Sequence, residues 1–192
     1  MSHVRELQGI RDLLPLAAAF PRRYPALLES VARGSARTRY DILFAFPDDE
    51  IRLDRDGVVR DANGVDVGAS FLSALDAAWS DARIPRADDQ RLPFRGGWLV
   101  YLGYELAGEI EPKLRLPRAP GEAQPVALAL RCPAAIILDH VRESTWLVTE
   151  ADRPELLDTL AADACAARAA VAPLRARAAI DEDAPARFID GV

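Results

Sequence analysis

Residues 93–106 read Pro-Phe-Arg-Gly-Gly-Trp-Leu-Val-Tyr-Leu-Gly-Tyr-Glu-Leu, and this stretch decides the fold that we expect. The Gly96-Gly97 pair can adopt backbone angles that are closed to other residues, and it lets another segment approach closely, so a β-strand is expected to begin there. Beyond it, Tyr101 and Leu102 fall on opposite faces of the strand. Large side chains on both faces indicate a strand that is covered on both sides. The stretch therefore predicts a strand in the centre of a sheet.

The segments on either side predict antiparallel strands. Residues 50–60 alternate apolar and polar side chains around Asp56-Gly57, which is a strong signal for a β-hairpin. Apolar runs that end at proline or polar turns predict strands at residues 26–30, 39–47, 126–131, 134–139 and 145–149, with residues 61–68 as a loop. Hairpin signals dominate, and strands do not alternate regularly with helices. The predicted fold class is therefore α+β, with mainly antiparallel twisted sheets packed as a sandwich and a few outer helices.

Three helices are expected. Apolar side chains at helical spacing predict a first helix within residues 4–14. Residues 69–83 predict a second helix, in which Ser70 is the N-cap and Trp79 belongs to the buried stripe. Acidic residues and a proline in the first turn predict a third helix over residues 152–173.

The composition sets the class of protein. The chain has 192 residues, 50% hydrophobic and 28% charged, as in a globular domain with a real core. A net charge of −6 argues against a nucleic-acid binder. The two cysteines do not have the spacing of metal ligands, and they do not indicate a disulfide framework. A reducing cytoplasm is therefore expected. The apolar run at residues 13–20 is too short to span a membrane. The two histidines, His3 and His140, build neither a metal site nor a catalytic triad.

The opening stretch also resembles a segment of a known family. The matching residues are Pro93-Phe94-Arg95-Gly96-Gly97, Tyr101, Gly103-Tyr104-Glu105 and Glu111. They are similar to a segment of the chorismate-using enzymes anthranilate synthase component I and aminodeoxychorismate synthase component I. That segment belongs to the N-terminal half of these proteins, which does not perform the chemistry. The resemblance implies an N-terminal domain over residues 1–174, followed by a linker and the start of a truncated chorismate-binding catalytic domain at residues 175–192.

A second match lies within residues 24–47. Tyr24-Pro25, Leu27-Leu28-Glu29-Ser30, Arg39-Tyr40-Asp41-Ile42 and Pro47 resemble the Leu-Leu-Glu-Ser segment and the following strand of the same family. In relatives that bind tryptophan, this segment lines the amino-acid pocket. By position, the effector-binding candidates are Glu29, Ser30, Arg37, Arg39 and Tyr40. A carboxylate suits an α-ammonium group, a hydroxyl orients either polar end, and tyrosine supplies an aromatic wall. The alternative is that Ser30 only ends a strand and Arg39 is a solvated edge residue.

Glu109 and Glu111 form an acidic pair beside the aromatic stretch. Two carboxylates suggest acid–base catalysis. The resemblance argues against this role, because it implies that the general acid, the general base and the magnesium-binding glutamates lie in the other half of the protein. We therefore interpret both residues as solvated loop acids, and we expect no catalytic residue and no metal ligand in this chain.

The resemblance also implies a reaction and partners. Residues 97–108 look closer to aminodeoxychorismate synthase (para-aminobenzoate synthase), which aminates chorismate for folate biosynthesis, and anthranilate synthase of tryptophan biosynthesis is the alternative. The full-length enzyme would use Mg²⁺, its own catalytic domain and a glutamine amidotransferase subunit. A free-standing module that binds tryptophan and regulates another protein is a hypothesis of a different class. It is favoured by the presence of the pocket segment in a chain that lacks the catalytic motifs.

Overall fold

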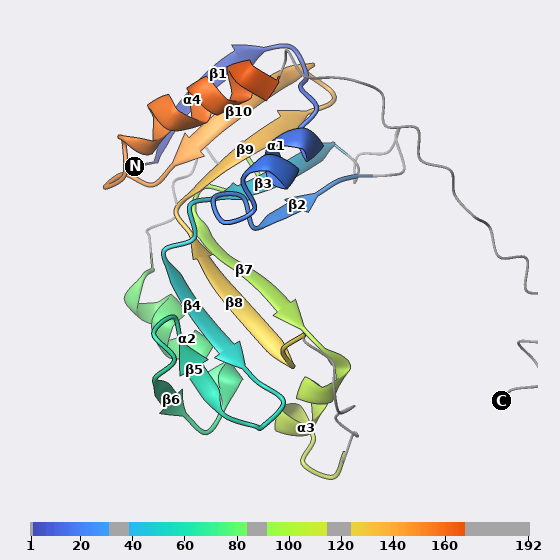
Figure 1. The fold of residues 1–192 in the computed structure, drawn as a ribbon, viewed down its shortest axis with the longest axis vertical. Helices are drawn as coiled ribbons and strands as arrows, with labels where there is room; N and C mark the ends of the chain where they lie inside the picture. The colour runs from blue at the N-terminus through green and yellow to red at the C-terminus, as the bar shows by residue number, and fades with distance from the viewer. Residues whose placement is uncertain (1, 31–38, 84–91, 115–123, 168–192) are drawn as a thin grey trace, which may run out of the picture.

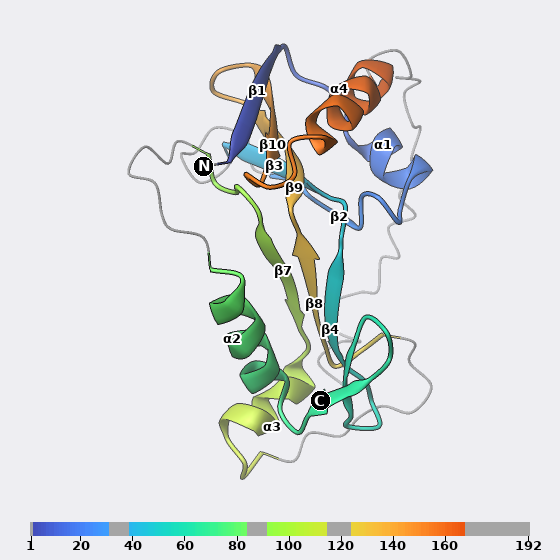
Figure 2. The same cartoon turned by 90° about the vertical axis from the view of Figure 1, so that its left-hand side faces the viewer.

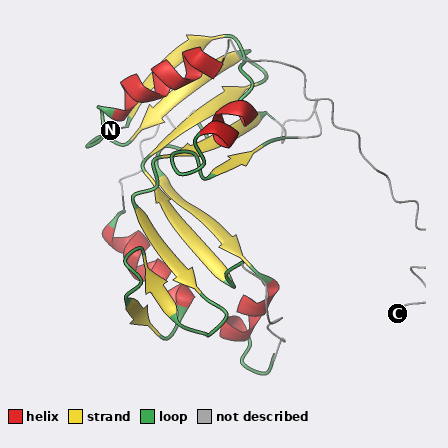
Figure 3. Ribbon diagram, viewed as in Figure 1, coloured by secondary structure: helices red, strands yellow, loops and turns green. Residues whose placement is uncertain are grey.

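The computed structural model describes residues 2–30, 39–83, 92–114 and 124–167, and all statements below concern these residues. Two five-stranded sheets follow one another along the long axis of the molecule (Figure 1). Every strand pairing within them is antiparallel. Helices lie on a face of each sheet, and a short helix lies beyond the far end of the second sheet (Figure 3). The predicted α+β class with mainly antiparallel sheets is confirmed.

The first sheet, drawn at the top of Figure 1, has the strand order β1-β10-β9-β3-β2. Its strands are β1 (His3–Gln8), β2 (Ala26–Leu28), β3 (Tyr40–Ala45), β9 (Ala134–Asp139) and β10 (Ser144–Thr149). The central strand β9 is buried along its whole length, as expected for an uninterrupted apolar run between two neighbours.

The second sheet has the strand order β6-β5-β4-β8-β7. Its strands are β4 (Asp49–Leu53), β5 (Val59–Asp61), β6 (Asp66–Gly68), β7 (Gly97–Leu102) and β8 (Ala127–Cys132). The predicted hairpin is β4–β5, and Gly57 in its turn has a φ of 84°, which glycine adopts without steric cost.

At two places in the chain, a strand of one sheet is followed directly by a strand of the other (Figure 2). Strand β8 continues into β9 across Pro133 alone, and β3 continues into β4 across residues 46–48. Proline cannot donate to a strand ladder, so the hydrogen-bonded pairing is interrupted there and the direction can change. Phe46, in the other connection, has a φ of 57°, which is uncommon for a residue with a side chain. The segments β3–β4 and β8–β9 are neighbours in both sheets, so the two sheets are joined by two adjacent segments that bend at the same place.

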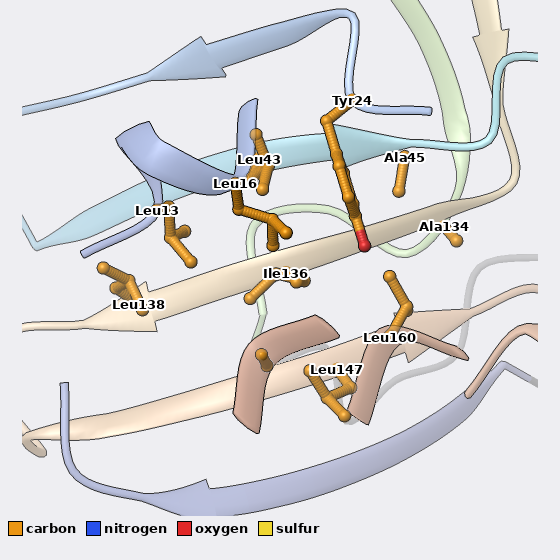
Figure 4. Packing of buried hydrophobic residues seen from close by; sticks show 11 residues of the cluster. Leu13, Leu16, Tyr24, Leu43, Ala45, Ala134, Ile136, Leu138, Leu147 and Leu160 are labelled. Atoms are coloured by element: carbon orange, nitrogen blue, oxygen red, sulfur yellow. The ribbon is translucent and has the colours of Figure 1, made fainter. Parts of the chain in front are cut away.

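Helices α1 (Leu14–Ala19) and α4 (Leu156–Ala167) cover one face of the first sheet. Their apolar side chains meet those of β3, β9 and β10 in a single core cluster (Figure 4). Helix α2 (Phe71–Asp81) covers the second sheet, where Phe71 is completely buried. A 3₁₀ helix, η1 (Tyr104–Leu106), and a short helix, α3 (Ala107–Ile110), follow β7.

Strand β7 is the main correction to the sequence-based fold. It lies at the edge of the second sheet, not in its centre, and Val100, Tyr101 and Leu102 are exposed. The strand also ends at Leu102: the backbone N–H of Gly103 still donates to the carbonyl of Val126, and the chain then turns into η1. Large side chains on both faces indicate an apolar strand, but they carry no information on how many neighbours it has.

Three local predictions are also wrong. Residues 3–8 form strand β1, because all six pair with the open edge of β10. Residues 66–68 form strand β6 within the predicted loop. Trp79 is 50% exposed, because Leu75 and Ala78 fill the helix face that packs on the sheet, and Arg83 stacks on the Trp79 ring.

Glu109 is not a solvated loop acid. Its carboxylate accepts hydrogen bonds from the backbone N–H groups of Phe71 (3.0 Å) and Leu72 (3.2 Å) and from the hydroxyl of Ser70 (2.9 Å). Ser70 itself is the N-cap, as predicted, and accepts from the Ser73 N–H. A negative charge at a helix N-terminus satisfies donors that have no partner within the helix. Glu111, by contrast, is exposed.

Candidate functional site

A row of polar side chains crosses the end of the first sheet. The strand register places Tyr40 opposite Asp139, and Asp139 opposite Ser144. Ser30 lies two residues beyond Leu28, where β2 ends opposite Ile42, and extending that register by two residues places Ser30 beside Tyr40. These four residues, which we call the polar row, lie on the face of the sheet that turns away from α1 and α4.

Asp139 is the anchor of the polar row. Its side chain is 1% exposed, and its carboxylate accepts from Arg39 Nε (2.9 Å) and Arg39 Nη2 (2.6 Å). The backbone N–H groups of Val141 and Arg142 also donate to it. The bonds from Arg39, followed by these backbone bonds, lower the pKa of Asp139, so it is ionised at neutral pH. A bidentate pair fixes the plane of the guanidinium, and Arg39 lies over the ring of Tyr40 at 4.8 Å.

A second acid, Asp41, lies on the opposite face of β3 and holds the segment that carries Ser30. Its carboxylate accepts from the backbone N–H of Ser30 (2.8 Å) and pairs with His140 Nε2 (2.7 Å). His140 donates its own backbone N–H to the carbonyl of Arg39. Asp41 and His140 therefore tie the backbone of Ser30 and the backbone of Arg39 to the turn that follows β9.

An apolar row lies directly beside the polar row. The register aligns Leu28, Ile42, Ile137 and Trp146 across four neighbouring strands. Leu92 and Phe94 pack against the same face. A surface with polar and charged groups in one row and aliphatic and aromatic groups in the next suits a small molecule that is charged at one end and apolar at the other.

Of the five predicted effector-binding residues, Arg39 and Tyr40 are in contact with each other, and Ser30 is bonded to Asp41, the residue that follows Tyr40. Glu29 is exposed at the end of β2. Arg37 lies outside the described residues. Sequence reasoning did not select Asp41, Asp139 or His140, although an acid inside or at the end of an apolar strand is a signal, because buried carboxylates require partners.

Other kinds of site find little support in the described residues. Within residues 2–167, outside the gaps given above, no three His, Cys, Asp or Glu side chains gather as metal ligands. Cys132 and Cys165 are both free, and burial raises the pKa of the Cys132 thiol to about 12. A thiol with such a pKa is a poor nucleophile at neutral pH. None of the helices described is long and apolar enough to cross a bilayer.

Comparison with known proteins identifies the fold. No protein-family model matches the chain. An anthranilate synthase component I-like protein of Synechocystis is 39% identical to it over 80 residues, which are 42% of this chain and 16% of that protein. The crystal structure of anthranilate synthase component I from Streptococcus pneumoniae matches with a TM-score of 0.55 and 22% identity, over 87% of this chain and 38% of that one. The fold is that of anthranilate synthase component I.

These comparisons agree with the resemblance inferred from the motifs at the level of component I-like proteins. The chain spans only 38% of the solved anthranilate synthase component I and 16% of the Synechocystis protein. The preference for the aminodeoxychorismate branch, the division at residue 174 and the five effector-binding candidates stay predictions.

Proposed function

We propose that this chain is the N-terminal structural and regulatory half of a chorismate-aminating enzyme, and specifically of aminodeoxychorismate synthase component I. The fold of anthranilate synthase component I, found over 87% of this chain but only 38% of the solved protein, carries the proposal. The motifs at residues 24–47 and 93–111 support it. The catalytic half of such an enzyme would supply the acid, the base and the Mg²⁺ ligands. A glutamine amidotransferase subunit would supply ammonia.

The choice of branch can be tested by complementation. The coding region that contains residues 1–192 is introduced into one bacterial strain that needs para-aminobenzoate and another that needs tryptophan. We expect growth without para-aminobenzoate only, and aminodeoxychorismate as the product from chorismate. Residues 1–192 alone should rescue neither strain. Rescue of the tryptophan strain, with anthranilate as the product, would move the chain to anthranilate synthase, and turnover by residues 1–192 alone would contradict a purely regulatory role.

We further propose that the polar row and the apolar row bind an amino acid, with tryptophan as the effector. Ser30→Ala tests this cleanly, because Ser30 contacts Asp41 through its backbone N–H, which the substitution keeps. If the hydroxyl binds a polar group of tryptophan, the change should weaken binding by about 1–3 kcal/mol in titration calorimetry. Ser73→Ala, an exposed position on α2, is the control. Equal affinities of the two variants would leave Ser30 as a strand-end residue.

A free-standing amino-acid-binding module is the second candidate function. It is favoured by the polar row, whose four residues all lie in this chain. A module should bind tryptophan without another domain, so tryptophan should raise the melting temperature of residues 1–192. An enzyme half whose pocket is completed by its catalytic domain should show a much smaller rise.

A further inference from the structure

Two polar atoms on the face of the candidate site lack hydrogen-bond partners among the described residues. They are the hydroxyl oxygen of Ser144 and the indole nitrogen of Trp146, and both atoms are buried. The whole Ser144 residue is 2% exposed. Buried polar groups are nearly always paired, and an unpaired one costs stability. Alanine at position 144 would avoid that cost, so the serine calls for an explanation.

Both atoms belong to the site by register. Ser144 lies opposite Asp139 at the end of the polar row, and Trp146 lies opposite Ile137 at the end of the apolar row. Residues 144 and 146 are on the same face of β10. Cross-strand neighbours of this kind have Cβ atoms only about 5 Å apart. A ligand that spans Tyr40 and Asp139 is therefore within reach of both atoms.

The charges around Asp139 indicate which chemical group fits. Two arginines face this carboxylate, since Arg39 bonds it through Nε and Nη2, and Arg142 Nε lies 4.0 Å from Asp139 Oδ2. The carboxylate already accepts four hydrogen bonds. It has little capacity left for a ligand, whereas two guanidinium groups against one carboxylate favour an anion. An indole N–H can only donate. The missing partner is therefore an acceptor, and the excess of guanidinium groups favours one with negative charge.

We propose that the Ser144 hydroxyl and the Trp146 indole N–H bind the carboxylate of the amino-acid effector, beside Arg39. This inference rests on the proposed function of the site and assigns its carboxylate-binding end. Leu92 and Phe94 pack on the same face, so the ligand enters by displacing part of this cover. Ligand binding then gives the two polar atoms the partners that they lack among the described residues of the ligand-free protein.

The test compares Ser144→Ala with Thr149→Val. Thr149 Oγ1 is also buried and has no partner in the described part of the chain, but the residue lies opposite Ala134, on the α4-facing side of the same strand. Both variants remove an unpaired hydroxyl, so both should keep or raise the melting temperature of the ligand-free protein. Only Ser144→Ala should weaken L-tryptophan binding, by about tenfold. Tryptamine, which has no carboxylate, should bind the wild type and Ser144→Ala equally.

Nuclear magnetic resonance provides a direct readout of Trp146. Residues 1–192 contain three tryptophans, and in the ¹⁵N-labelled full-length protein the variants Trp146→Phe and Trp79→Phe identify the indole N–H signals of Trp146 and Trp79. Unlabelled L-tryptophan is invisible in this experiment. We expect its addition to move the Trp146 signal downfield, as a new hydrogen bond does, and to leave the exposed Trp79 unchanged. Tryptamine should not produce the same shift.

The outcomes separate the two proposals. If the wild type binds tryptophan while Ser144→Ala keeps full affinity and the Trp146 signal stays in place, the amino-acid site stands and its carboxylate end is assigned wrongly. A loss of affinity that is equal for tryptamine and L-tryptophan also overturns the assignment. If the wild type binds no tryptophan in its full-length form, both proposals fail.

Discussion

Replacing Gly96 by alanine is expected to destabilise the protein by about 4 kcal/mol or more, which is a large fraction of the stability of a typical domain. A Cβ atom at this position would lie 2.1 Å from Glu150 Oε1 and 2.3 Å from Glu150 Cγ. Gly96 also has a φ of 104°, which costs a residue with a side chain about 1–2 kcal/mol. Because Glu150 is buried and paired with Arg131, moving it aside would break a buried ion pair, at about 3–5 kcal/mol.

Gly9→Ala is the matched control for this prediction. Gly9 has a similar positive φ of 82°, but no atom lies within 4 Å of a Cβ built there. Its substitution should cost only the backbone strain, about 1–2 kcal/mol. Urea denaturation measures the free energy of unfolding of both variants. In a Glu150→Ala background, Gly96→Ala should cost no more than Gly9→Ala does. Equal effects of the two glycine substitutions in the wild-type background would show that contact with Glu150 is unimportant.

Local patterns predicted most strands and two of the helices. The Asp56-Gly57 hairpin, the buried strand at residues 134–139 and the Ser70 N-cap depend on neighbours close in sequence, so a short window contains the necessary information. The position of β7 at a sheet edge was not predictable in this way. Sheet order depends on pairings between distant segments, and β7 has one partner, β8, in the described chain.

The candidate site was predictable only in part. Ser30, Arg39 and Tyr40 came from the resemblance to a family, and their role in binding stays a prediction. Their supports did not follow from the sequence, because Arg39 and Asp139 are 100 residues apart and His140 and Asp41 are 99 apart. An unpaired hydroxyl such as that of Ser144 is invisible to any sequence pattern, since it is recognised only once all its neighbours are placed.

Replacing Arg131 by methionine is expected to cost about 3–5 kcal/mol at neutral pH, because it leaves the carboxylate of Glu150 buried without its partner. Arg131 Nη2 donates to both carboxylate oxygens of Glu150 at 2.6 Å, and Nη1 donates to the carbonyl of Gly97 (3.1 Å). The side chains are 12% and 6% exposed, so water cannot replace the lost bonds. The pair joins β8 to the residue that follows β10, where the two sheets meet, and it holds the first residue of β7.

The same substitution should make stability depend on pH in a defined direction. Burial raises the pKa of Glu150, and the hydrogen bond from Arg131 opposes this rise. Without Arg131 the pKa in the folded state rises further above its value in the unfolded state. Between those two values the folded state binds more protons, so stability falls as pH increases. Relative to the wild type, Arg131→Met should therefore be least destabilised at acid pH and should lose stability as the pH rises through the folded-state pKa of Glu150.

Two variants check the cause of this pH dependence. Adding Glu150→Gln to Arg131→Met removes the charge, so the double variant should recover stability at neutral pH and lose the additional pH dependence. Arg153→Met breaks the more exposed pairs with Asp48 (2.6 Å) and Glu155 (3.1 Å), and it should cost about 1 kcal/mol or less. Urea denaturation between acid and neutral pH measures the free energy of unfolding of the wild type, of the two single variants and of the double variant. A deficit in Arg131→Met that is the same at every pH would mean that lost packing, and not the uncompensated charge of Glu150, destabilises the variant.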